Sequence, residues 1–277
     1  MVTIEDSFIK SKHNTRSMCE DELILTDNYV GVIDGATSQE SNFLGNKKSG
    51  QWISEIISNS LKNVVSASKD NIVNIINRHI CKCYKENGVY DLLKYDPIKR
   101  PSASIAVIDF FKKEIIMIGD CQCLIDGKLY RKESYLDVLL SSIRSKINTY
   151  YLANGYSVND IINDDMGRQY ILPILEKKKL FQNNLIKNNY TYYVVDGFPV
   201  PSEGVITIKI TNITKNIILA TDGYPKLFNT LKESEKYLQN IIQEDPLCIK
   251  KYKSTKGLCA DCCSFDDRSY IKISLKK

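Results

Sequence analysis

The sequence predicts an α+β fold, because strand-like and helical segments occur in separate blocks. Three strand-like runs open the chain, two helical stretches follow, and a second group of strand-like runs comes next. A long helical stretch then precedes the last group of strands. Several of the strands are joined by tight turns, whereas repeated βαβ units would place a helix between each pair. We therefore expect one layered α+β domain over residues 1–277.

The first half of the chain supplies two of these blocks. Three strands are predicted from TIEDSFI (3–9), DELILTD (21–27) and YVGVIDG (29–35). Apolar residues then recur at helical spacing from Trp52 to Val65 and again from Ile72 to Cys83, and the ENG at 86–88 predicts the end of the second helix. The run at 102–131 predicts three further strands, with Asp126-Gly127 as a two-residue hairpin turn.

The second half begins with residues 136–187, which predict helices interrupted near Gly155 and Gly167. Strands are expected again in TYYVVDGF (191–198), GVITIKI (204–210) and NIILATDG (216–223). The stretch SEKYLQNIIQED (234–245) predicts a helix that ends before Pro246, and RSYIKISL (268–275) predicts a closing strand.

Composition excludes several classes of protein. The 277 residues are 43% hydrophobic and 26% charged, as in ordinary globular proteins, and the net charge of +5 comes from lysines spread along the whole chain. Because no basic stripe is present, we do not expect a nucleic-acid partner. No apolar run approaches the roughly 18 to 20 residues of a membrane span, and residues 1–14 hold no apolar signal core, so we expect no membrane partner and a cytoplasmic location.

The nine cysteines fit a reducing compartment, where thiols stay free. Their close groups, CKC (81–83), CQC (121–123) and CADCC (259–263), do not have the matched pairs of a zinc site. We expect small buried apolar side chains, with a labile disulfide or an adventitious metal as the alternatives.

Asp-Gly occurs four times, at 34–35, 126–127, 196–197 and 222–223. A turn explains 126–127 and is the default reading of 196–197. The pairs at 34 and 222 differ, because each follows a long apolar strand and precedes a region that looks helical. A carboxylate there is held at a sheet end, and the glycine lets other groups approach the backbone. Spacing alone leaves a turn and a functional site as equal alternatives.

Further acidic residues favour a functional site. Asp21 begins the strand that leads toward Asp34, so a strand out and a strand back would return both to the same sheet end. Asp266 and Asp267 come directly before the last strand. Four converging carboxylates repel one another unless cations lie between them, and ligation by oxygen alone suits Mg²⁺ or Mn²⁺.

The order of these motifs resembles the metal-dependent serine/threonine protein phosphatases, the PPM or type 2C family, in its bacterial members. The matching stretches are RSMCED (16–21), GVIDGAT (31–37), RPSASIAVID (100–109), IIMIGDCQ (115–122), IILATDGYPKLF (217–228) and SFDDRSYIKI (264–273). The resemblance spans nearly the whole chain. It implies a four-layer α-β-β-α sandwich, with two central antiparallel sheets flanked by helices and a binuclear metal centre at one end.

The resemblance also implies a ligand set for two Mn²⁺ or Mg²⁺ ions. Asp34 would bridge both ions, while the carbonyl of Gly35 and the carboxylate of Glu20 would bind one of them. Asp222 and Asp266 would hold the other. Asp120 matches an aspartate that binds a third, weaker ion in some members.

Two further residues carry roles implied by the resemblance. Asp21 would orient metal-bound water. Arg16, four residues before Glu20, would grip the substrate phosphate, for which its planar guanidinium is suited.

The chain departs from the family pattern in places. Eukaryotic members often carry a histidine where Ala36 stands, and the acid that protonates the leaving group is unassigned, although His13 lies three residues before Arg16. Lys226 occupies a position where some members have another acid. This argues against a third ion unless Asp164 or Asp165 reaches the site; otherwise these two are surface acids. Residues 136–190 correspond to the variable flap of the family, where the resemblance implies substrate selection.

The expected function is hydrolysis of phosphoserine and phosphothreonine in a phosphorylated protein substrate, by a metal-bridging hydroxide. One alternative is a weak or inactive phosphatase-fold protein that regulates or senses. Another is a binuclear hydrolase of a small phosphoester.

Overall fold

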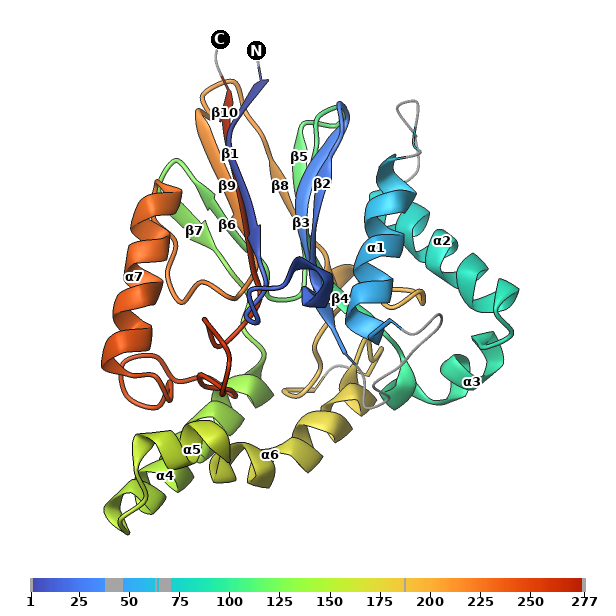
Figure 1. Ribbon diagram of the computed structural model, residues 1–277. Coiled ribbons are helices and arrows are strands. Elements are labelled where there is room, and N and C mark those ends of the chain that lie inside the picture. The colour runs from blue at the N-terminus through green and yellow to red at the C-terminus, as the bar shows by residue number, and fades with distance from the viewer. Residues whose placement is uncertain (1, 38–46, 63, 65–70, 187, 276–277) are drawn as a thin grey trace.

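Two antiparallel five-stranded sheets lie face to face in the computed structural model, which describes residues 2–37, 47–62, 64, 71–186 and 188–275 (Figure 1). The first sheet has the spatial order β1 (Val2–Lys10), β10 (Arg268–Leu275), β9 (Asn216–Ala220), β6 (Gln122–Ile125) and β7 (Lys128–Tyr130). The second has the order β2 (Asp21–Leu25), β3 (Tyr29–Ala36), β4 (Ser102–Asp109), β5 (Glu114–Ile118) and β8 (Ile206–Lys209).

Along the strands, apolar side chains point alternately to the inner and the outer face, and both faces of each sheet are buried. In β3, Val30 and Val32 point between the sheets, whereas Tyr29 and Ile33 point to the opposite face. In β9 the same alternation sends Ile217 and Leu219 inward and Ile218 and Ala220 outward. Because successive side chains of a strand face opposite sides, each sheet contributes to an inner core and to an outer one.

Helices cover the two outer faces (Figure 1). Helix α1 (Ser49–Lys62) packs on the outer face of the second sheet, α2 (Ile72–Glu86) packs against α1, and both contribute buried side chains to the same core. Asn71 caps α2, and its side chain accepts a hydrogen bond from the Val73 amide. Helix α7 (Leu231–Glu244) covers the first sheet and is capped by Thr230. The predicted α+β class and the four-layer sandwich are therefore confirmed.

Three further helices lie across one end of the sandwich, opposite the chain termini (Figure 1). They are α4 (Tyr135–Ala153), α5 (Val158–Asn163) and α6 (Met166–Lys177), and the 3₁₀ helix η4 (Lys178–Phe181) continues the last of them. Asp165 caps α6 and also accepts two hydrogen bonds from the fully buried Arg144 of α4. We call the segment from α4 to η4 (residues 135–181) the helical insert, and this buried contact fixes its two longer helices against each other.

Most predicted elements are confirmed, including the hairpin at Asp126-Gly127, the end of α2 at Glu86 and the closing strand. Within the stretch at 52–65 the helix ends at Lys62, and Val65 lies outside the described residues. The insert breaks after α4 as expected near Gly155, but its second break falls before Asp165, and Gly167 lies in the first turn of α6.

The predicted strand at 191–198 is wrong. Only isolated bridges occur there, between Val195 and Ala103 and between Tyr192 and Gln182. The amide and carbonyl of Val194 bond instead to the side chain of Asn183, which removes the need for a neighbouring strand. Asp196 is buried in this segment and pairs with Arg100 at 3.3 Å, so it has a structural role.

The run at 102–131 forms four strands rather than three. After β5 the chain turns at Gly119, which has a φ of 87°, and passes from the second sheet to the first. A glycine is needed because a Cβ there would lie 2.1 Å from the Ser104 hydroxyl.

The cysteines follow the prediction in part. Cys121 and Cys123 are buried between the sheets, as expected. Cys259 and Cys262, in contrast, form a disulfide, which is the alternative that the close cysteine groups left open. Within the described ranges, no helix has the length and apolar character that crossing a membrane requires.

Candidate active site

Acidic side chains from five segments meet at the end of the sandwich that faces the helical insert. Asp21 opens β2 and stands opposite Asp34 of β3 in the strand register. Ser104 of β4 stands on the other side of Asp34. The predicted return of Asp21 and Asp34 to one sheet end is therefore correct, and it follows from the antiparallel pairing of the two strands.

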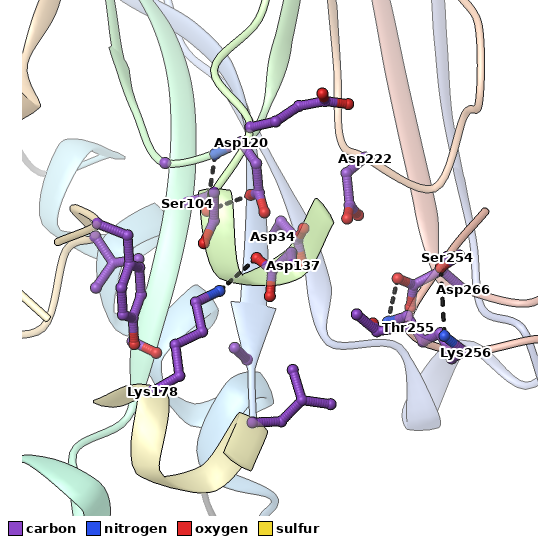
Figure 2. A pocket seen from close by; sticks show the side chains of 18 of the residues that line it. Asp34, Ser104, Asp120, Asp137, Lys178, Asp222, Ser254, Thr255, Lys256 and Asp266 are labelled. Carbon is purple, nitrogen blue, oxygen red and sulfur yellow. Dashed lines mark hydrogen bonds and ion pairs between the residues drawn. The ribbon is translucent and has the colours of Figure 1, made fainter. Parts of the chain in front are cut away.

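The first sheet brings its acids to the same place. Asp222 follows β9 directly, and Asp266 and Asp267 precede β10. These groups line a cavity of about 490 Å³ whose acidic wall is formed by Glu20, Asp21, Asp34, Asp120, Asp222 and Asp266. The insert and the C-terminal loop add cations on the other side of the cavity: Arg168, Lys178, Lys179 and Lys253. Lys12, from the segment after β1, and Lys256 lie instead beside Asp266. Figure 2 shows Asp34, Asp120 and Asp222 pointing toward one another, with Lys178 and Lys256 beyond them.

The two Asp-Gly glycines allow close approach of backbone segments, as their positions predict. A Cβ on Gly35 would lie 2.2 Å from the Gly50 carbonyl of α1. A Cβ on Gly223 would lie 2.1 Å from the Asp267 carbonyl. The second contact holds the Asp222 turn against the segment that carries Asp266, so the glycine joins the two halves of the acidic wall.

Replacing Gly223 by alanine is expected to destabilise the protein by about 1–3 kcal/mol, because the Asp267 backbone has to move. Urea denaturation measures the change. Gly127→Ala is the control, since Gly127 has a positive φ but a Cβ added there would meet no atom within 4 Å. A cost for Gly223→Ala no larger than that of Gly127→Ala would contradict this contact.

The acidic wall carries negative charge that the protein does not fully compensate. Burial raises the pKa of Asp34 well above its ordinary value, and the charges of Asp222 and Asp21 raise it further. Burial and the charge of Asp120 raise the pKa of Asp222 from 3.8 to about 7. A cation among these groups would favour their ionised forms.

Asp266 differs, because it already has cationic partners. Lys256 forms an ion pair with it, and the Lys12 ammonium lies 3.8 Å from its other oxygen. Burial alone would raise the pKa of Asp266, but the two lysines hold it below its ordinary value. The acidic wall thus has a compensated side at Asp266 and an uncompensated side at Asp34 and Asp222.

Neighbouring polar groups fix the other acids. The Thr221 hydroxyl donates to Asp21 at 2.8 Å, and burial raises the pKa of Asp21. Asp267 accepts from the amides of Glu20 and Lys12 at 2.7 and 2.8 Å. Asp267 therefore connects the start of β2 to the last strand. The second aspartate of the Asp266-Asp267 pair thus has a structural role.

Asp120 and Glu20 also have partners within the cavity wall. The Ser104 hydroxyl donates to Asp120 at 2.6 Å, which gives a physical reason for the serine in the SAS motif. The Thr37 hydroxyl donates to Glu20, and burial raises the pKa of Glu20. Sequence reasoning did not single out Ser104, Thr37 or Thr221 individually, although all three stand in the quoted motifs.

Several predicted residues lie outside the cavity wall. Arg16, in the 3₁₀ helix η1 (Arg16–Met18), pairs with Glu22 at 2.9 Å and has a half-exposed side chain. His13 faces Cys262, with its Nδ1 atom 3.5 Å from the sulfur. Lys226 lies over the rings of Phe228 and Tyr237.

The two acids of the insert have local roles. Asp164 accepts a hydrogen bond from Gln169, and Asp165 holds Arg144. Asp165 is therefore part of a largely buried ion pair, which corrects the expectation of an ordinary surface acid.

The donor set fits hard divalent ions chemically, since every candidate ligand is an oxygen. Burial raises the pKa of Asp34 and of Asp222, and neighbouring carboxylates raise both further. In the described part of the chain, no three His, Cys, Asp or Glu side chains are grouped closely enough to hold an ion as they stand. The ion pair with Lys256 and the hydrogen bonds from Thr221 and Thr37 account for the orientation of three of the acids.

Comparison with solved structures relates this architecture to bacterial phosphatases. The serine/threonine phosphatase PstP/Ppp of Mycobacterium tuberculosis is 11% identical, with a TM-score of 0.50 over 100% of this chain and 99% of that chain. A bacterial serine phosphatase is 15% identical, with a TM-score of 0.49 over 99% and 98% of the two chains. Stp1 of Staphylococcus aureus is 13% identical, with a TM-score of 0.48 over 99% and 96%. No protein-family model matches the sequence, and no curated protein matches it.

The first of these similarities shows that the chain has the fold of bacterial PPM-type serine/threonine phosphatases. At this identity the likeness concerns the fold alone. The chemistry has to be argued from the residues in the cavity.

Proposed function

We propose that the protein is a divalent-metal-dependent phosphatase that removes phosphate from phosphoserine and phosphothreonine in protein substrates. The observation that carries this proposal is the meeting of Asp34 and Asp222, from opposite sheets, on one wall of a cavity that cations of the insert also line. The acidic wall suits divalent ions, and the cations suit the phosphate dianion.

The residues divide into ion-binding and supporting groups. Glu20 and the Gly35 carbonyl would hold one ion, Asp222 and Asp266 would hold the other, and Asp34 would bridge the two. When bound, two such ions activate water at neutral pH and offset the charge of the phosphoryl oxygens.

Supporting residues fix the donors and meet the substrate. Thr221 fixes Asp21 beside the ion ligands, which suits a role in orienting the attacking water. Arg16 would contact the phosphate after leaving Glu22, and this exchange has a low cost because exposed ion pairs contribute only about 0–1 kcal/mol. Asp120, held by Ser104, would be the ligand of any third ion.

A regulatory or sensing protein with this fold is the second candidate. Two observations favour it: Lys256 occupies one side of Asp266, and Arg16 is directed away from the cavity. A hydrolase of small phosphoesters is the third candidate, since a cavity of about 490 Å³ would accommodate such a substrate.

Purified protein in Mn²⁺ is expected to hydrolyse p-nitrophenyl phosphate and a phosphothreonine peptide, and EDTA is expected to abolish both activities. A panel of nucleotides and sugar phosphates distinguishes the third candidate, which requires faster turnover of a small phosphoester than of the peptide. A folded wild-type protein that binds Mn²⁺ but hydrolyses no substrate would support the regulatory candidate.

A further inference from the structure

A lysine side chain lies within the acidic wall of the cavity. The Lys256 ammonium pairs with one oxygen of Asp266, and Figure 2 shows this pair next to Asp222. The Lys256 ammonium therefore stands in direct contact with one of the acids that we propose as ion ligands.

The backbone on both sides of Lys256 is held in place by the helical insert. The Ser254 carbonyl accepts from Arg144 of α4 at 3.0 Å, and the Thr255 carbonyl accepts from Arg168 of α6 at 2.7 Å. On the other side, the Leu258 amide donates to the Pro246 carbonyl at 2.8 Å. These hydrogen bonds on both sides thus fix the backbone position of Lys256.

The residue after Lys256 leaves no room for the loop to shift inward. A Cβ on Gly257 would lie 2.7 Å from both the Arg144 guanidinium and the Leu247 carbonyl. Arg144 is itself immobilised, because Asp165 accepts two of its hydrogen bonds and Asn148 donates to Asp165 at 2.9 Å. The loop that carries Lys256 is therefore held firmly. Lys256 has an ion pair with Asp266, whereas no ion pair of Lys253, in the same loop, is found among the described residues.

The position of Lys256 divides the acidic wall into two unequal ion sites. An ion at Asp222 and Asp266 has to displace the ammonium, whereas no ion pair of Glu20 or Asp34 is found in the described part of the chain. We infer that Lys256 determines the metal stoichiometry: the chain holds one divalent ion firmly at Glu20 and Asp34, and binds a second, at Asp222 and Asp266, only by displacing Lys256. This inference rests on the proposed function, because it concerns the same ions.

Isothermal titration with Mn²⁺ tests the inference without measuring activity. The wild-type protein is expected to bind one Mn²⁺ tightly and a second at least about tenfold more weakly, which corresponds to about 1.4 kcal/mol. Lys256→Met removes the ammonium and keeps much of the side-chain volume, so it is expected to tighten the second site at least about tenfold. Lys253→Met, on the same loop, controls for the loss of one positive charge near the cavity and should keep the two Mn²⁺ affinities of the wild-type protein. Lys256→Arg should keep the second site weak.

The outcomes separate this inference from the proposed function. Two tight sites in the wild-type protein, or unchanged or weaker binding in Lys256→Met, would overturn the inference and leave metal-dependent hydrolysis standing. No Mn²⁺ binding by either protein would overturn the proposed function, and the inference with it. Circular dichroism verifies that each variant is folded, and Lys256→Gln replaces Lys256→Met if the methionine variant does not fold.

Discussion

Replacing Asp222 by asparagine is expected to lower Mn²⁺-dependent phosphatase activity at least about a hundredfold. Loss of groups that merely support metal ligands costs about 10–100-fold, and a direct ligand should cost no less. Asparagine keeps the size of the side chain and removes its charge, so the loss of activity measures the contribution of the negative charge. Initial rates with p-nitrophenyl phosphate at saturating Mn²⁺ measure the effect, and Asp34→Asn should behave in the same way.

The same substitution is expected to stabilise the metal-free protein. The pKa of Asp222 rises from 3.8 to about 7 on folding, so the folded state binds more protons than the unfolded state between these values. The contribution of Asp222 to stability is then fully present below about pH 4 and is lost as the pH rises through about 7. At pH 8 in EDTA, Asp222→Asn should raise the free energy of unfolding by on the order of 1 kcal/mol.

Asp27→Asn provides the matched control, because Asp27 is exposed and lies between β2 and β3, at the opposite end of the strand pair from the cavity. It should change neither activity nor the pH dependence of stability. An Asp222→Asn protein that retains activity near the wild-type level, or that loses stability in EDTA at pH 8, would contradict the assigned role of this carboxylate.

Replacing Arg144 by methionine is expected to destabilise the protein by about 3–5 kcal/mol, the range for removing one partner of a buried ion pair. Arg144 is fully buried, and it donates to Asp165 and to the Ser254 carbonyl. Methionine fills part of the volume and leaves both acceptors without this donor. Urea denaturation monitored by circular dichroism measures the change.

Lys146→Met, an exposed position on the same helix, is the control and should cost less than about 0.5 kcal/mol. A double variant that also carries Asp165→Ala should lose less stability than the sum of the two single variants, because both single changes break the same contact. A cost below about 1 kcal/mol for Arg144→Met would show that the insert is not held in this way.

The sequence predicted the Asp21–Asp34 part of the acidic wall because the geometry of this pair depends on local rules. Two antiparallel strands joined by a short turn place Asp21 opposite Asp34, whatever the rest of the chain does. Strand alternation likewise predicts which residues of β9 and β10 are buried.

The cationic part of the site could not be predicted in this way. Lys256 lies in a loop with no periodicity, and its position depends on Arg144 and Arg168, each of which bonds to a carbonyl 110 or 87 residues later in the chain. Arg144 itself has the spacing of any polar residue on a helix. The absence of the predicted strand at 191–198 also depends on a side chain outside that segment. Asn183 bonds to the amide and the carbonyl of Val194, which in a strand would bond to a neighbouring strand.

The central claim is that the carboxylates of Asp34 and Asp222 share a divalent ion. Crystals grown in Mn²⁺, with anomalous diffraction recorded at the manganese absorption edge, test it directly. We expect an anomalous peak about 2.1 Å from an oxygen of Asp34 and from an oxygen of Asp222, within the cavity at the end of the sandwich. A map from a Mn²⁺-saturated crystal in which no peak contacts both carboxylates, or with manganese bound only elsewhere on the protein, would contradict the shared ion.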